Sequence, residues 1–157
     1  MYNPLSNIDL NNYIKEIDKK GVQIYDLNKL KANTYIEDIF NHRGHCILFY
    51  GPNNAGHWIT CLRNPNKEIY FIDSFGEDPD YYNKEFLKCM RNNGIKQVHV
   101  NKDVLQNDKT QVCGRYGVIL TAMNKMGIDP PIMIDFLKDG ADKCGGNVDK
   151  FILKLTK

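Results

Sequence analysis

Three side chains in this sequence are of the types, and in an order, that nucleophilic attack on a carbonyl carbon requires: His57, Asp73 and Cys113. Cys113 follows a polar stretch and opens a long apolar segment that we expect to be helical. The thiolate is the nucleophile, and unpaired N–H groups at the start of a helix favour a negative charge there. Buried cysteine is more often a small hydrophobe. That ordinary interpretation suits three cysteines within apolar segments, Cys46, Cys61 and Cys89.

A histidine and an acid stand at the two ends of a predicted hairpin. His57 starts the predicted strand 57–63, behind a glycine-bearing loop, and Asp73 ends the predicted strand 68–73. The turn Asn64-Pro65-Asn66 lies midway between them, so antiparallel pairing brings them close together. A carboxylate there orients the imidazole and stabilises its charged form. The remaining histidines are expected to be structural: His42, His45 and His99.

Nucleophilic attack on a carbonyl carbon also needs donors for the oxyanion of the tetrahedral intermediate. The main-chain N–H of Cys113 is one candidate. Gln106 and Gln111 both precede the nucleophile on the same predicted loop, and a side-chain amide from either would serve as the second donor. Spacing alone does not choose between them. Gly114, beside the nucleophile, leaves room for a substrate backbone.

The elements that position these residues follow from hydrophobic periodicity and turn signals. The predicted strands are 46–50, 57–63, 68–73 and 96–100. The predicted helices are 6–18, 80–92, 113–126, 130–137 and 147–155, with one or two short helices within 26–40. This order indicates one α+β domain over residues 1–157, with a central, mostly antiparallel sheet and flanking helices.

Composition excludes several classes of protein. The net charge of +2 is well short of a dedicated nucleic-acid binder, so nucleic acid is only a minor candidate partner. The N-terminal residues lack the pattern of a secretory signal, and no apolar run approaches the roughly 18 residues of a membrane span. We therefore expect no membrane partner, and interpret the 5 cysteines as reduced thiols in a cytosol-like compartment. The cluster His42, His45 and Cys46 fits no zinc spacing, so no metal is predicted.

Two segments, GHWITCLRNPNKEIYFIDSFG (56–76) and LQNDKTQVCGRYGVIL (105–120), resemble adenain, the adenovirus maturation protease, and its relatives. The SUMO-deconjugating peptidases share that wider fold group. The shared pattern is His-Trp on a strand, an acid before x-Phe-Gly on the next strand, then Gln, a polar spacer and Cys-Gly opening a helix. Here it reads His57-Trp58, Asp73-Ser74-Phe75-Gly76, Gln106 and Cys113-Gly114.

The resemblance implies an adenain-like fold with the nucleophile at the N-terminus of a core helix. It also implies roles: His57 as base, Asp73 as its orienter, Cys113 as nucleophile and Gln106, rather than Gln111, as oxyanion donor. Adenain has glutamate as the acid, whereas Asp73 matches the SUMO peptidases. The residues bordering the histidine and the cysteine are expected to contact substrate: Gly56, Trp58 and Gly114.

A relative of this kind is a monomeric cysteine endopeptidase that cleaves after Gly-Gly sites. It processes viral capsid or scaffold precursors in the host cytoplasm, the viral factory or the virion. The chain is least like the family beyond residue 127, so the resemblance does not carry over the activating peptide and DNA cofactor of adenain. No cofactor is predicted, and a peptide or DNA activator stays open. Gly145-Gly146 is expected to be a loop turn, with self-cleavage after Gly146 as a hypothesis.

Three alternatives compete with a maturation protease. A deconjugase for SUMO or another ubiquitin-like modifier uses the same triad and the same Gly-Gly preference. A caspase-like peptidase matches Gln111-Val112-Cys113-Gly114 in part, but His57 is followed by Trp58 rather than glycine. A catalytically silent binding domain would keep the fold and lack thiol reactivity at Cys113.

Overall fold

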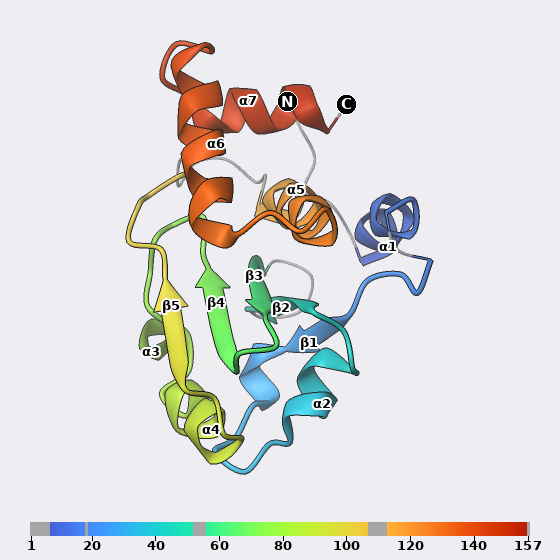
Figure 1. Ribbon diagram of the computed structural model, residues 1–157, viewed down its shortest axis with the longest axis vertical. Coiled ribbons are helices and arrows are strands. Elements are labelled where there is room, and N and C mark those ends of the chain that lie inside the picture. Colours follow the sequence, from blue (N-terminus) through green and yellow to red (C-terminus); the bar gives the residue numbers. More distant parts are fainter. Residues whose placement is uncertain (1–6, 18, 52–55, 107–112, 157) are drawn as a thin grey trace.

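The computed structural model in Figure 1 is an α+β structure, in which helices flank a five-stranded mixed sheet. It describes residues 7–17, 19–51, 56–106 and 113–156. The strands, in the order in which they pair across the sheet, are β1 (Ile24–Asp26), β2 (His45–Tyr50), β3 (His57–Arg63), β4 (Glu68–Ile72) and β5 (Gln97–Val100). The four strands predicted from the sequence are β2 to β5.

The pairing corrects the prediction of a mostly antiparallel sheet. β2, β3 and β4 pair antiparallel, but β1 pairs with β2, and β5 with β4, in parallel. β1 has only three half-buried residues, too few to show a period in the sequence. Between β4 and β5 the chain passes through two helices, and such a crossover returns the next strand in the same direction.

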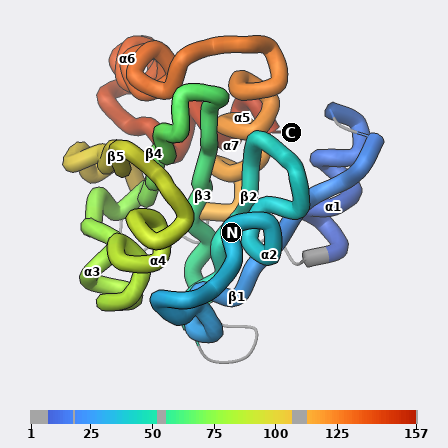
Figure 2. Tube along the Cα trace, turned by 60° about the horizontal axis from the view of Figure 1, so that its bottom comes forward, coloured from blue at the N-terminus to red at the C-terminus, as the bar shows by residue number. Residues whose placement is uncertain are grey.

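Helices cover both faces of the sheet, and Figures 1 and 2 show the same division from two sides. One face carries a 3₁₀ turn, η1 (Leu27–Lys29), with α2 (Ile36–Phe40), α3 (Pro79–Tyr82) and α4 (Phe86–Asn92). The other carries α1 (Asn7–Lys15), α5 (Cys113–Lys125), α6 (Pro130–Asp142) and α7 (Val148–Leu155). The predicted helix 80–92 is therefore two helices, because Asn83 is extended (φ −155°). α6 continues beyond its predicted end at residue 137.

Alternation along β3 explains why both faces are covered. Ile59 and Cys61 belong to the core beneath α2 and α4, while Trp58 and Leu62 belong to the cores on the side of α5. All four side chains are buried, as expected for a strand between two layers of helices.

Helix α5 lies close against the sheet because Gly117 has no side chain. A Cβ at this position would lie 2.9 Å from Ile47 Cδ1 and 3.4 Å from Thr60 Oγ1, so a larger residue would require the Ile47 side chain to move. This close contact brings the first residue of α5, Cys113, to the start of β3. The predicted placement of the cysteine at a helix start is confirmed.

Candidate active site

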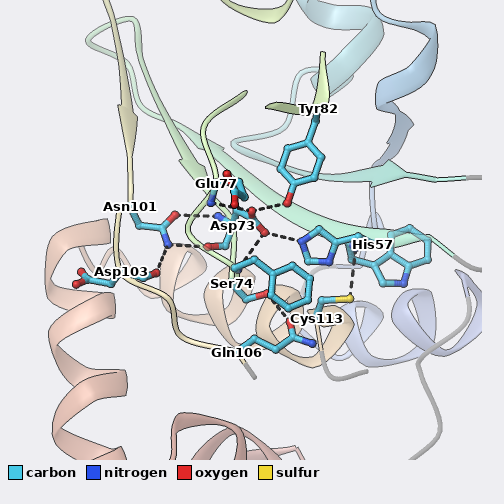
Figure 3. Close-up of polar contacts among 11 residues, drawn as sticks. His57, Asp73, Ser74, Glu77, Tyr82, Asn101, Asp103, Gln106 and Cys113 are labelled. Atoms are coloured by element: carbon cyan, nitrogen blue, oxygen red, sulfur yellow. Dashed lines mark hydrogen bonds and ion pairs between the residues drawn. The ribbon is translucent and has the colours of Figure 1, made fainter. Parts of the chain in front are cut away.

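His57 and Asp73 lie together where β3 begins and β4 ends. The β3–β4 ladder ends at the pair Thr60 and Ile72, so Asp73 directly follows the last paired residue of β4, while His57, the first residue of β3, pairs with Tyr50 of β2. His57 Nε2 is 2.5 Å from Asp73 Oδ1 (Figure 3). The contact predicted from the hairpin is therefore present in the structure.

Asp73 is fully buried and its carboxylate is surrounded by donors. Besides His57, Oδ1 accepts the main-chain N–H of Phe75 at 3.2 Å. Oδ2 accepts the Tyr82 hydroxyl at 2.5 Å and the main-chain N–H of Glu77 at 3.1 Å. Burial alone would raise the pKa of Asp73, but the hydrogen bonds, led by those from His57 and Tyr82, outweigh it and hold the pKa below its ordinary value.

The backbone around Asp73 is held as firmly as its side chain. Asn101, just beyond β5, accepts the main-chain N–H of Asp73 at 2.8 Å and donates to its carbonyl at 2.7 Å. The Gly76 N–H closes a turn onto the same carbonyl at 2.9 Å. Gly76 has a φ of +74°, and a Cβ there would lie 3.0 Å from the carbonyl oxygen of Asp103, so this turn requires glycine.

The Cys113 sulfur sits on the other side of the His57 ring. Cys113 is 8% exposed, and its Sγ accepts the main-chain N–H of Trp58 at 3.4 Å. His57 also stacks on the Phe75 ring, with centroids 4.5 Å apart. Burial would lower the pKa of His57, but hydrogen bonds and charge interactions with Asp73 and Cys113 raise it to about 9. The carboxylate and the sulfur therefore both favour the protonated form of the imidazole.

Gln106 lies beside this group and Gln111 falls outside the described residues. Gln106 is 2% exposed, and its Oε1 accepts the Ser74 hydroxyl at 2.5 Å. Figure 3 shows the Gln106 carboxamide near Cys113, with its nitrogen on the side away from Ser74. The preference for Gln106 stays a prediction about its role, but its position is compatible with that role.

Local packing explains the three residues predicted to contact substrate, Gly56, Trp58 and Gly114, at least as well as substrate binding does. Trp58 is 7% exposed and packs on Phe49 with ring centroids 4.9 Å apart, so little of its side chain is available to a substrate. A Cβ on Gly56 would lie 2.3 Å from Phe49 Cε2, which explains that glycine without a substrate. Gly114 is buried in the first turn of α5.

The other cysteines and histidines lie apart from this cluster. All five cysteines are free thiols. Burial raises the pKa of Cys46 and of Cys61, as expected for small hydrophobic side chains. His42 and His99 pair with Glu37 and Glu68, respectively, and His45 is buried in β2.

The described part of the chain contains neither a cluster of metal-binding side chains nor a membrane-spanning helix. Over residues 7–17, 19–51, 56–106 and 113–156, no three histidine, cysteine or acidic side chains gather as a metal site would require. No helix in these same ranges is long and apolar enough to span a membrane.

The pair Gly145-Gly146 forms the turn that ends α6. Both glycines have positive φ, and the Gly146 N–H donates to the Ala141 carbonyl at 2.8 Å. This turn explains the glycine pair without cleavage.

The sequence did not predict the two residues that hydrogen-bond Asp73 from other elements, Tyr82 and Asn101. It also gave Ser74 no role. Tyr82 ends α3, inside what the sequence indicated as one continuous helix, and no spacing rule connects it to Asp73. Asn101 follows a short strand whose parallel pairing was not expected. A polar residue just beyond a strand that neighbours the one bearing the acid is the signal that could have found it.

Comparisons with known proteins inform the fold alone. No protein-family model matches the sequence, and no curated protein matches it. Among solved structures, the chain is similar to the central domain of an uncharacterized protein, Lpg1148, from Legionella pneumophila. The identity is 16%, the TM-score is 0.55, and the match covers 99% of this chain and 97% of that domain.

Proposed function

We propose that this chain is a cysteine peptidase with an adenain-like fold, in which Cys113 is the nucleophile, His57 the base and Asp73 its orienter. One observation carries the proposal: the His57 imidazole contacts a buried carboxylate at 2.5 Å, and Cys113, at the start of α5, lies close enough for its thiol to raise the pKa of that imidazole. A nucleophile, a base and a group that orients the base, gathered in this way, are what covalent catalysis needs.

The first chemical step is acylation. The Cys113 thiolate attacks the carbonyl carbon of the scissile bond and forms a C–S bond, and the electron pair of the C=O bond moves to oxygen. The main-chain N–H of Cys113 and the Gln106 amide donate hydrogen bonds to this oxyanion. When the oxyanion collapses, the C–N bond breaks and the His57 imidazolium gives its proton to the leaving amine.

The second step is hydrolysis of the thioester. A water molecule attacks the acyl carbon while His57 accepts one of its protons. The C–S bond then breaks, releasing the carboxylic acid and restoring the thiolate beside the imidazolium. Asp73 keeps the ring oriented throughout, and its many donors keep it ionised.

The substrate that we propose is a protein precursor with Gly-Gly before the cut, such as a viral capsid or scaffold protein. Support for this part comes from the resemblance of residues 56–76 and 105–120 to adenain. In peptidases of that kind, a narrow cleft excludes side chains next to the scissile bond, which favours glycine there.

Thiol alkylation tests the site directly. Native protein and a His57→Ala variant are treated with limiting iodoacetamide at pH 7, and the labelled cysteines are mapped. An ordinary thiol is only a few per cent thiolate at this pH, so we expect Cys113 to label about tenfold or more faster than Cys144, and the His57→Ala variant to lose the difference. Cys144 is the internal reference, because it is a half-buried free thiol outside the cluster. Equal labelling of Cys113 and Cys144 would contradict the proposal.

A panel of peptides and probes then distinguishes the candidates. Cleavage after Gly-Gly supports an endopeptidase, whereas reaction with a probe carrying the C-terminus of a ubiquitin-like modifier favours a deconjugase. Unreactive Cys113 together with no cleavage would leave a binding domain.

A further inference from the structure

Ser74, the residue after Asp73, contacts Gln106 through both its main chain and its side chain. Its carbonyl oxygen accepts the N–H groups of Leu105 and Gln106, each at 2.8 Å. Its hydroxyl donates to Gln106 Oε1 at 2.5 Å. Ser74 and Gln106 are 3% and 2% exposed, so water has little access to replace these bonds.

A carboxamide accepts at its oxygen and donates at its nitrogen, so its orientation decides what it offers a substrate. With its oxygen held by the Ser74 hydroxyl, the Gln106 carboxamide has its NH₂ group on the side facing Cys113 (Figure 3). A flipped amide would present oxygen to a developing oxyanion and repel it. We propose that Ser74 is a positioning residue that fixes the Gln106 carboxamide in the donating orientation.

The inference deepens the proposed function and rests on it. It gives the Asp73-Ser74-Phe75-Gly76 turn two tasks, since Asp73 orients the base and Ser74 orients the oxyanion donor. The loop is also held from the helical side, where the Tyr116 hydroxyl of α5 lies 3.0 Å from the Leu105 carbonyl oxygen. Ser74 therefore fixes the Gln106 side chain, and the segment that carries Gln106 is held both by Ser74 and by α5.

A double-mutant cycle tests the inference. Turnover of a fluorogenic Gly-Gly peptide amide is measured for the wild type, Ser74→Ala, Gln106→Ala and the double variant. We expect Ser74→Ala to lower kcat about tenfold with little change in KM, the cost of losing one orienting hydrogen bond. Gln106→Ala is expected to lower kcat by about 10² or more, as for other oxyanion donors. The double variant should be no slower than Gln106→Ala alone, because Ser74 acts through Gln106.

Alkylation separates this inference from the proposed function. Iodoacetamide reacts by displacement: the Cys113 sulfur forms a bond to carbon, iodide leaves and no oxyanion forms. Ser74→Ala should therefore label at the wild-type rate. Ser74→Thr keeps the hydroxyl and should stand closer to the wild type in kcat than Ser74→Ala does. Thr121→Val, which removes a buried hydroxyl of α5 that has no hydrogen-bond partner among the described residues, is the control and should keep the wild-type kcat.

Each outcome has one meaning. Unreactive Cys113 in the wild type overturns the proposed function and this inference with it. A reactive and active wild type with an unchanged kcat in Ser74→Ala overturns the inference alone. Losses that add in the double variant, or slow labelling of Ser74→Ala, also overturn it, because Ser74 would then act elsewhere than on the Gln106 amide.

Discussion

The two sides of the His57 imidazole are built differently. On the acid side, the fully buried carboxylate of Asp73 accepts two main-chain N–H groups and the Tyr82 hydroxyl as well as His57. On the thiol side, Cys113 Sγ accepts the Trp58 N–H at 3.4 Å and interacts with His57. The acid is fixed by a turn that many bonds hold, whereas the sulfur is placed mainly by the helix that carries it.

This difference follows from the elements that supply the two residues. Asp73 continues a central strand, and the turn that follows it provides two main-chain donors, from Phe75 and Glu77, at fixed places. Cys113 begins α5, which is located by packing, as the close approach of Gly117 to Ile47 shows. Loss of the acid should therefore cost stability as well as activity, while loss of the sulfur should cost mainly activity.

The largest effect is expected at the thiol side. Cys113→Ala should lower peptidase turnover by on the order of 10⁴ or more, because the nucleophile is gone. Its free energy of unfolding should fall by less than that of the Asp73→Asn variant, since the sulfur accepts one weak main-chain hydrogen bond and supplies only part of the His57 pKa shift. Turnover and urea unfolding check both parts, with Cys144→Ala as the matched control. A variant that keeps turnover, or that unfolds readily, would break the comparison.

The acid side should respond in both measurements. Asp73→Asn keeps the shape but turns an NH₂ group toward donors that need an acceptor. Turnover should fall by about 10³ to 10⁴. The free energy of unfolding should fall by about 3 kcal/mol, the cost of charge-assisted hydrogen bonds left unmade in a buried place.

Asp103→Asn is the control for this change. Asp103 pairs with Lys138 at 2.9 Å with its side chain 49% exposed, so its loss should cost less than about 1 kcal/mol. If Asp73→Asn and Asp103→Asn had equal unfolding free energies, the acid side would not be the structural anchor that its contacts indicate.

The sequence predicted the contacts around Asp73 less completely than the grouping of His57, Asp73 and Cys113. His57 and Asp73 could be paired because a hairpin with a short turn leaves little freedom in register. Cys113 could be placed because a polar stretch before an apolar run indicates a helix start. Tyr82 and Asn101 reach Asp73 from α3 and from the end of β5, and their approach depends on a parallel crossover. Such long-range geometry leaves no local period, which is also why β1 and the mixed sheet were missed.

The pH dependence tests whether the two sides share one charged imidazole. His57 should titrate in the native protein with a pKa of about 9, and Cys113→Ala should lower that value by removing one source of the shift. A raised pKa means that the stabilising contribution of His57 is fully present below its unfolded value of about 6.5 and is lost as the pH rises through about 9. At about 1.4 kcal/mol per pH unit, the His57 contribution amounts to up to about 3 kcal/mol.

NMR of the imidazole protons in the wild type, Cys113→Ala and Asp73→Asn measures this directly. Both variants should titrate at lower pH than the wild type. An unchanged midpoint in either one would show that its partner contributes nothing to the charge on the ring.

The smallest effect is expected at Tyr82, and it shows whether the acid side is held by more bonds than it needs. Tyr82→Phe keeps the ring against Tyr50 and removes the hydroxyl that Asp73 Oδ2 accepts. Since the Glu77 N–H still reaches that oxygen, the unfolding free energy should fall by only about 1 to 2 kcal/mol. The pKa of Asp73 should rise, because one of the donors that lower it is gone, so the acidic limb of the pH–rate profile should move to higher pH.

Tyr81→Phe, a neighbouring tyrosine that is 67% exposed, is the control and should change neither property. If Tyr82→Phe were as inactive as Asp73→Asn, the remaining donors could not hold the carboxylate. The two sides of His57 would then differ in the number of their contacts but not in their tolerance to loss.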